Sequence, residues 1–191
     1  MKAAVYILTL VLLAAVSCAP SHEQATLATA EAVMQQHPDS ALALLQTLDS
    51  RQLESDDDRA LYALLLSQAY DKNYIDLTDD SLISIAVNHY GGTGDHRHAM
   101  LAHYYHGRIH YNAGDYLACM LSCLNSENHA LKVSDNFYLG MIYRLISDIF
   151  NNSYVFEEAF KYAELSYECG SDTAFAEKRK KCGADSGRCG I

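Results

Sequence analysis

From about residue 20 onward, apolar side chains recur every three or four positions, the spacing of an amphipathic α-helix, and alternation with a period of two is scarce. Before that point, residues 3–16 form an apolar run interrupted only by Thr9. Both prolines, Pro20 and Pro38, lie in the first fifth of the chain, so no later position is barred from a helix interior by a missing N–H. The pattern predicts an all-α fold with about seven or eight helices.

The helical pattern repeats along the chain. In the last unit, large side chains on one helix are followed by small ones on the next: Tyr143, Ile146 and Phe150, then Ala159, Ala163 and Ser166. The position of Ala159 is taken in earlier units by Ala41, Leu82 and Cys119, at separations of 41, 37 and 40 residues. Because small side chains let two helix axes approach closely, each unit is expected to be a packed helix pair.

The order of large and small positions resembles the tetratricopeptide repeat, whose length is about 34 residues. Gly107 falls at the position of closest helix contact, and Gly114 and Asp115 fall where the first helix of a pair ends and the second begins. Cys119 and Cys123 lie one turn apart and are expected to act as small buried side chains. The resemblance implies a right-handed superhelical stack of antiparallel helix pairs.

Residues 1–18 have the features of an export signal. Lys2 precedes the apolar run, which is too short to span a bilayer comfortably, and the run ends in Ala15, Val16, Ser17 and Cys18. Small residues before a cysteine resemble the lipobox of bacterial lipoproteins. The resemblance implies a signal peptide over residues 1–18 and a lipid attached to the thiol of Cys18, which would hold the chain on a membrane; a plain secretory signal cleaved near Ala19 is the alternative.

Two segments, residues 59–83 and the helix that opens at Pro38, resemble the N-terminal region of a Bacteroidales family of tetratricopeptide lipoproteins. Relatives in that family resemble sensory or regulatory proteins that continue into a membrane helix and a helix-turn-helix domain. We therefore expect a helical repeat domain over residues 19–168. Residues 169–191 carry Lys, Arg, Gly and Cys without a periodic apolar face and are expected to form an irregular tail.

The net charge and the absence of known motifs argue against several classes of function. The formal net charge of −10 argues against binding to a nucleic-acid backbone, which requires a basic face. No Gly-x-Ser-x-Gly, phosphate-binding loop or dinucleotide-binding motif is present, so we expect neither an enzyme nor a cofactor. The chain is instead expected to bind a protein or peptide.

The repeat resemblance implies where such a partner would bind. Positions 5, 9 and 12 of each first helix line the concave face of tetratricopeptide proteins. The corresponding residues that we predict to contact the partner are Tyr70, Tyr104, Arg108, Tyr111, Arg144, Asp148 and Asn151. Arginine offers a forked hydrogen-bond donor to carboxylates, and tyrosine offers a rigid amphipathic surface. An ordinary solvated surface is the alternative.

Five histidines gather in residues 96–110, and His103, His106 and His110 share one helix face. Imidazoles on one face can hold a transition metal. The same three residues occupy packing positions of the repeat, so partly buried rings are the preferred interpretation, and no metal site is assigned. A metal site made of these three residues is the weaker alternative.

These observations predict a membrane-anchored, non-catalytic scaffold in the cell envelope, facing the periplasm from the outer membrane, that binds a protein or peptide. Two alternatives stay open. The chain could be the periplasmic sensing part of a truncated signal-transducing transcriptional regulator, or it could be a histidine-rich metal-binding module.

Overall fold

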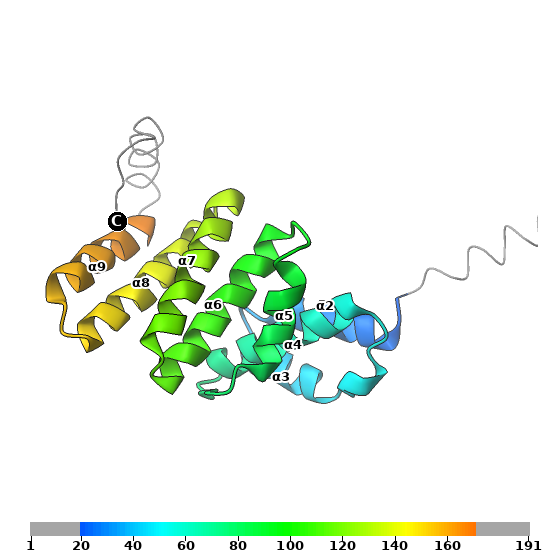
Figure 1. Ribbon diagram of the computed structural model, residues 1–191. Helices are drawn as coiled ribbons and strands as arrows, with labels where there is room; N and C mark the ends of the chain where they lie inside the picture. The colour runs from blue at the N-terminus through cyan, green and yellow to red at the C-terminus, as the bar shows by residue number, and fades with distance from the viewer. Residues whose placement is uncertain (1–19, 171–191) are drawn as a thin grey trace, which may run out of the picture.

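The computed structural model describes residues 20–170, which form eight α-helices, one short 3₁₀ helix and no strand (Figure 1). The prediction of an all-α fold is confirmed. In chain order the elements are α2 (His22–Val33), α3 (Pro38–Gln46), η2 (Ser50–Gln52), α4 (Asp56–Lys72), α5 (Ser81–Tyr90), α6 (His96–Ala113), α7 (Tyr116–Val133), α8 (Asn136–Asn152) and α9 (Phe156–Gly170). The predicted lipid site at Cys18 and residues 171–191 of the predicted tail lie outside the described residues.

Local signals in the sequence explain where the longer helices begin and end. Asp95, Asp115 and Asp135 precede α6, α7 and α8, and each side chain accepts a hydrogen bond from an N–H in the first turn of its helix. Gly114 ends α6 with a φ of 76°, a conformation that glycine adopts without the strain of a Cβ. The turn predicted at Gly114 and Asp115 is confirmed.

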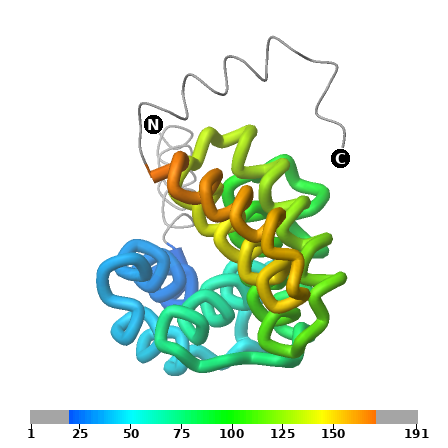
Figure 2. The backbone as a smooth tube through the Cα atoms, turned by 90° about the vertical axis from the view of Figure 1, so that its left-hand side faces the viewer, coloured from blue at the N-terminus to red at the C-terminus, as the bar shows by residue number. Residues whose placement is uncertain are grey.

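Consecutive helices pack in pairs, α2 with α3, α4 with α5, α6 with α7 and α8 with α9. The first helix of each pair also contacts the first helix of the next pair, and each second helix contacts the first helix that follows it. In the ribbon and tube views, α2 and α3 lie at one end of the molecule and α9 lies at the other (Figures 1 and 2). Helix α9 therefore packs on α8 without a described helix beyond it.

The α6–α7 pair shows why the small residues matter. A Cβ placed on Gly107 would lie 3.4 Å from the Cβ of Ser122 and 3.6 Å from the Sγ of Cys123. The hydroxyl of Ser126 donates across the same contact to the carbonyl oxygen of Met100 at 2.8 Å. Cys119 and Cys123 are fully buried free thiols, so the prediction of small packed side chains is confirmed.

A buried hydroxyl joins the two ends of the core. The hydroxyl of Tyr138 on α8 accepts hydrogen bonds from Gln35 at 3.2 Å and from Gln68 at 3.4 Å, and it lies 3.3 Å from the hydroxyl of Tyr105. These partners come from the turn after α2, from α4 and from α6. One phenol therefore links all four helix pairs of the described chain.

Some element boundaries differ from those predicted. Helix α4 starts at Asp56, ahead of the segment 59–83 that carries the family resemblance, because Ser55 caps it and three aspartates fill its first turn, where the helix dipole favours negative charge. Helix α9 continues through Cys169 to Gly170, two residues past the expected end of the repeat domain. The reason is packing: Cys169 is buried against Gly140 of α8.

Candidate functional site

The predicted partner-binding residues do not all reach the surface. Tyr104 is only 3% exposed, and its ring packs edge to face against Tyr105 and Tyr138. Burial raises the pKa of its phenol. Because Tyr104 belongs to the core, it offers no area to a partner in this structure. The neighbouring first-helix residues Tyr70 and Tyr111 are half-buried.

Arg108 is accessible but already has a partner. Its Nε donates to Oδ1 of Asp71 at 2.8 Å, and its guanidinium carbon lies 6.0 Å from the centre of the Tyr111 ring. Arg108 and Asp71 line a depression between α4, α6 and the loop after α4. Ser67, Ile75, Leu77 and Asn112 also line it. Asp71 occupies the Nε–H of Arg108, so a ligand carboxylate could use that edge of the guanidinium only by displacing Asp71, and would otherwise pair with the terminal nitrogens.

On α8 the three predicted residues are more open. Arg144 and Asn151 are exposed, and Asp148 is half-buried. The adjacent residue Asn152, which was not predicted, donates to the hydroxyl of Tyr111 at 2.8 Å and to that of Tyr116 at 3.2 Å. The predicted set is thus divided among a buried ring, two half-buried tyrosines, an arginine paired between α6 and α4, and an open stretch of α8.

A larger accessible apolar surface lies on α9, where no site was predicted. Phe156, Phe160 and Tyr167 are 62%, 67% and 81% exposed, and Ala163 is exposed between them. The spacing of four, three and four residues puts all four side chains on one face of the helix. Scattered exposed apolar residues are ordinary, but a continuous stripe of aromatic rings is typical of an interaction surface.

The repeat shows what this stripe corresponds to. Forty residues earlier, at the separation of Cys119 and Ala159, the same positions on α7 are occupied by Tyr116, Met120, Cys123 and Glu127. Cys123 is buried, Tyr116 and Met120 pack against the core, and Glu127 accepts a hydrogen bond of 2.7 Å from the Tyr143 hydroxyl of α8. Glu127 and Tyr116 of this α7 face thus contact α8, Cys123 packs toward Gly107 of α6, and the corresponding positions on α9 are accessible.

The three histidines of the predicted metal alternative separate into two groups. His103 stacks on His129 of α7, with ring centres 5.8 Å apart, and the Nδ1 of His129 lies 3.1 Å from that of His96. Burial lowers the pKa of His103 to about 4, so this ring is neutral at neutral pH. The structure does not bring His103 to the other two residues of the predicted metal alternative.

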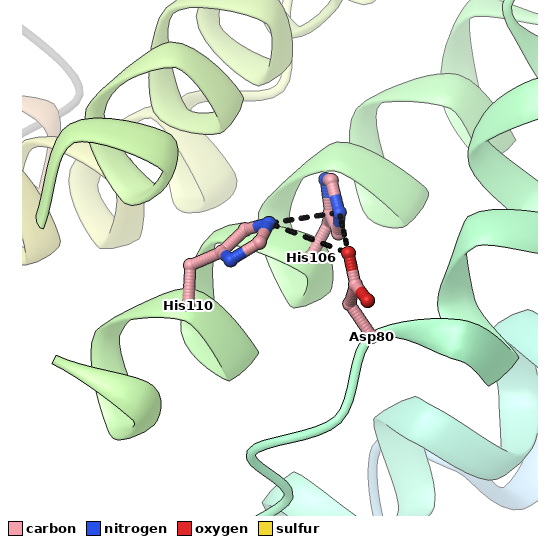
Figure 3. Close-up of side chains that lie close together, drawn as sticks. All are labelled: Asp80, His106 and His110. Atoms are coloured by element: carbon pink, nitrogen blue, oxygen red, sulfur yellow. Dashed lines mark hydrogen bonds and ion pairs between the residues drawn. The ribbon is translucent and has the colours of Figure 1, made fainter. Parts of the chain in front are cut away.

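His106 and His110 instead meet Asp80, the residue just before α5 (Figure 3). The Nε2 atoms of the two rings are 3.0 Å apart, and Oδ2 of Asp80 lies 3.2 Å from His106 and 3.7 Å from His110. Within residues 20–170 this is the group whose donor atoms converge closely enough to hold a metal ion. Asp80 was missed because it lies 26 residues before His106 and has the ordinary appearance of a helix cap.

Comparison of the chain with protein-family models, with curated proteins and with solved structures gave no match. None of the helices in the described part of the chain is long and apolar enough to cross a bilayer. Three features of the described chain are therefore candidate sites: the accessible face of α9, the α4–α6 depression and the group at Asp80.

Proposed function

We propose that this chain is a non-catalytic scaffold that binds another protein, and that the partner packs a helix against the accessible face of α9. In this proposal the helix pairs stack as a right-handed superhelix of tetratricopeptide type, and a lipid on Cys18 holds the chain in the cell envelope, facing the periplasm. The observation that carries the proposal is the equivalence between the α9 stripe and an α7 face that packs against the core and contacts α8.

Packing chemistry supports a helical partner. The α7 face contacts a helix, α8, through Tyr116 and Glu127, and the α9 face has the same spacing with aromatic rings at three of its four positions. Aromatic side chains that are exposed in the free protein contribute much of the binding energy when a partner buries them. The complementary surface is an amphipathic helix with an apolar stripe at the same spacing.

Charge supports a basic partner. Helix α9 carries Glu157, Glu158, Glu164 and Glu168 and a single lysine, Lys161. A second copy of the chain packed on this face would bring like charges together, and amphipathic helices that lie on membranes are typically basic rather than acidic. Lysine or arginine beside the partner's apolar stripe would be complementary to the glutamates of α9.

A pair of designed peptides tests both features of the expected partner, its apolar stripe and its charge. Both are amphipathic helices with the same leucine stripe, one flanked by lysines and the other by glutamates, and fluorescence anisotropy measures their binding to the purified chain. We expect the lysine-flanked helix to bind at least about tenfold more tightly, a difference of about 1.4 kcal/mol.

Two matched variants locate the binding. Phe160→Glu places a charge in the α9 stripe, whereas Leu121→Glu places one at a residue of α7 that is 57% exposed. Phe160→Glu is expected to abolish binding of the lysine-flanked helix, and Leu121→Glu is expected to leave it intact. Equal binding by the Phe160→Glu variant and the unchanged chain would refute the proposal for α9.

A further inference from the structure

The group at Asp80 has the dimensions of a metal site. In tetrahedral zinc sites the ion lies about 2.0–2.2 Å from nitrogen and oxygen ligands, which places any two ligand atoms about 3.3–3.6 Å apart. The three separations here are 3.0, 3.2 and 3.7 Å. One ion could therefore reach Asp80, His106 and His110 after side-chain shifts of a few tenths of an ångström, and the helices would not have to move.

Hydrogen bonding to Ser122 directs the free lone pair of His106 toward this centre. The Ser122 hydroxyl donates to the carbonyl oxygen of Ala118 at 2.9 Å, so its oxygen is left to accept a hydrogen bond from Nδ1–H of His106 at 3.1 Å. A neutral His106 with its proton on Nδ1 carries a lone pair on Nε2, which is the atom that faces Asp80. Metal-binding histidines commonly hold their second nitrogen in this way.

With this placement of protons, the group of Asp80, His106 and His110 has more acceptor atoms than N–H donors. With His106 neutral and protonated on Nδ1, the Nε2 lone pair of His106 and the carboxylate oxygen of Asp80 face one another at 3.2 Å. Nε2 of His110 can supply only one proton to these two acceptors. A divalent cation would satisfy all three atoms together.

The position of Asp80 is also unusual for a helix cap. Asp80 is the residue that precedes α5, yet its side chain makes no hydrogen bond to the helix. Asp79 accepts from the N–H of Ser81 in its place, at 3.1 Å. The carboxylate that would ordinarily cap α5 is thus turned toward α6 and is available as a ligand.

We propose that Asp80, His106 and His110 form a binding site for a divalent transition-metal ion of the zinc type, with a fourth position open to water. Two imidazoles and one carboxylate suit zinc, cobalt or nickel, whereas magnesium and calcium prefer ligand sets made of oxygen alone. The side chain of Asp80 is 45% exposed, so an ion can enter from solvent. A bound ion would fasten the loop before α5 to the middle of α6.

Calorimetric titration of the tag-free, full-length chain with zinc chloride tests the site. We expect one ion per chain at this site. Asp80→Asn and His110→Gln are each expected to weaken zinc binding at least about tenfold, because each removes a direct ligand. Ser122→Ala removes only the support of His106 and is expected to weaken binding by about tenfold. Zinc should also raise the melting temperature of the unchanged chain but not that of the ligand variants.

His103→Gln is the matched control, because His103 lies on the same helix one turn before His106 but outside the group. It is expected to bind zinc as the unchanged chain does. If a histidine variant fails to fold, Asp80→Asn still tests the proposal. The Asp80 side chain is accessible and caps no helix, so this variant is expected to fold. Zinc binding that is equal in Asp80→Asn, His110→Gln and the unchanged chain would assign the ion to other groups, such as thiols, and would overturn the proposal, as would no binding at all.

Discussion

At the scale of single residues, histidines and tyrosines make several of the polar contacts that join helices of different pairs. Tyr138 links four helix pairs through one hydroxyl, and His98 bridges α2 and α6 through Glu31 and Asp95. Sequence patterns correctly indicated that the rings of α6 would be partly buried, because packing positions recur with the helical period. The partner of each ring lies on another helix, and no local pattern encodes it.

Tyr138→Phe is expected to lower the free energy of unfolding by about 1–3 kcal/mol. The change removes a buried acceptor and leaves Gln68 and the hydroxyl of Tyr105 without their partner. Denaturant unfolding followed by circular dichroism measures the effect. Tyr167→Phe, at a ring that is 81% exposed, is the control and should be neutral. An equal effect of the two changes would contradict the role of the buried hydroxyl.

His98 makes the contact between α2 and α6 dependent on pH. The hydrogen bond to Glu31 raises the pKa of His98; burial opposes this shift, and the hydrogen bond to Asp95 adds to it. The hydrogen bonds with His98 in turn lower the pKa values of the Glu31 and Asp95 carboxyls. The stabilisation is therefore fully present between about pH 4.5 and 6.5 and is lost as the pH rises through the raised pKa of His98.

The free energy of unfolding of the unchanged chain should fall between about pH 6 and 8.5, when measured by denaturant unfolding. The fall should be no more than about 1 kcal/mol, because the ion pairs of His98 are partly exposed. His98→Gln should remove this component of the pH profile. A profile that His98→Gln leaves unchanged would show that the bridge contributes nothing to stability.

At the scale of elements, the two faces of α9 have different roles. One face packs against α8, where Ala159 and Cys169 are buried, and the other carries the stripe of Phe156, Phe160 and Tyr167. The repeat pattern marked Ala159, Ala163 and Ser166 as small packing positions and made no prediction for the three aromatic residues. It could not show that the second face lacks a described neighbour, because spacing identifies a surface suited to packing but not the element that covers it.

This difference predicts unequal effects of substitution. Phe160→Glu should change the unfolding free energy by less than about 0.5 kcal/mol, whereas Ile146→Ala in the core of α8 should cost about 2–5 kcal/mol. Thermal or denaturant unfolding of both variants gives the comparison. A large destabilisation by Phe160→Glu would mean that another part of the same chain already covers the stripe.

At the scale of the whole molecule, each helix pair packs mainly on its neighbours in sequence. This arrangement explains why helix number, the Gly114 turn and the buried small residues followed from the sequence: the contacts are local and repeat. The group of Asp80, His106 and His110 did not follow, because it joins two pairs across 26 residues of chain, and His103, the nearer candidate by spacing, faces α7 instead.

A stack of this kind should open from its ends. The terminal helices α2, α3 and α9 have neighbours on fewer sides than α6 and α8, so their amide hydrogens should exchange with solvent faster. Hydrogen–deuterium exchange resolved by peptide is the measurement. Uniform protection across all described helices would instead indicate one cooperative unit.

The claim that α9 is a protein-binding surface has a direct test. A photoreactive amino acid replaces Ala163, in the middle of the α9 stripe, or Asn128, an exposed residue of α7, and the chain is irradiated in the cells that produce it. Mass spectrometry then maps the cross-linked segments. We expect position 163, but not position 128, to link to a segment of another protein that forms an amphipathic helix with basic flanks. Cross-links that are the same at both positions, or that join position 163 only to this chain itself, would contradict this claim.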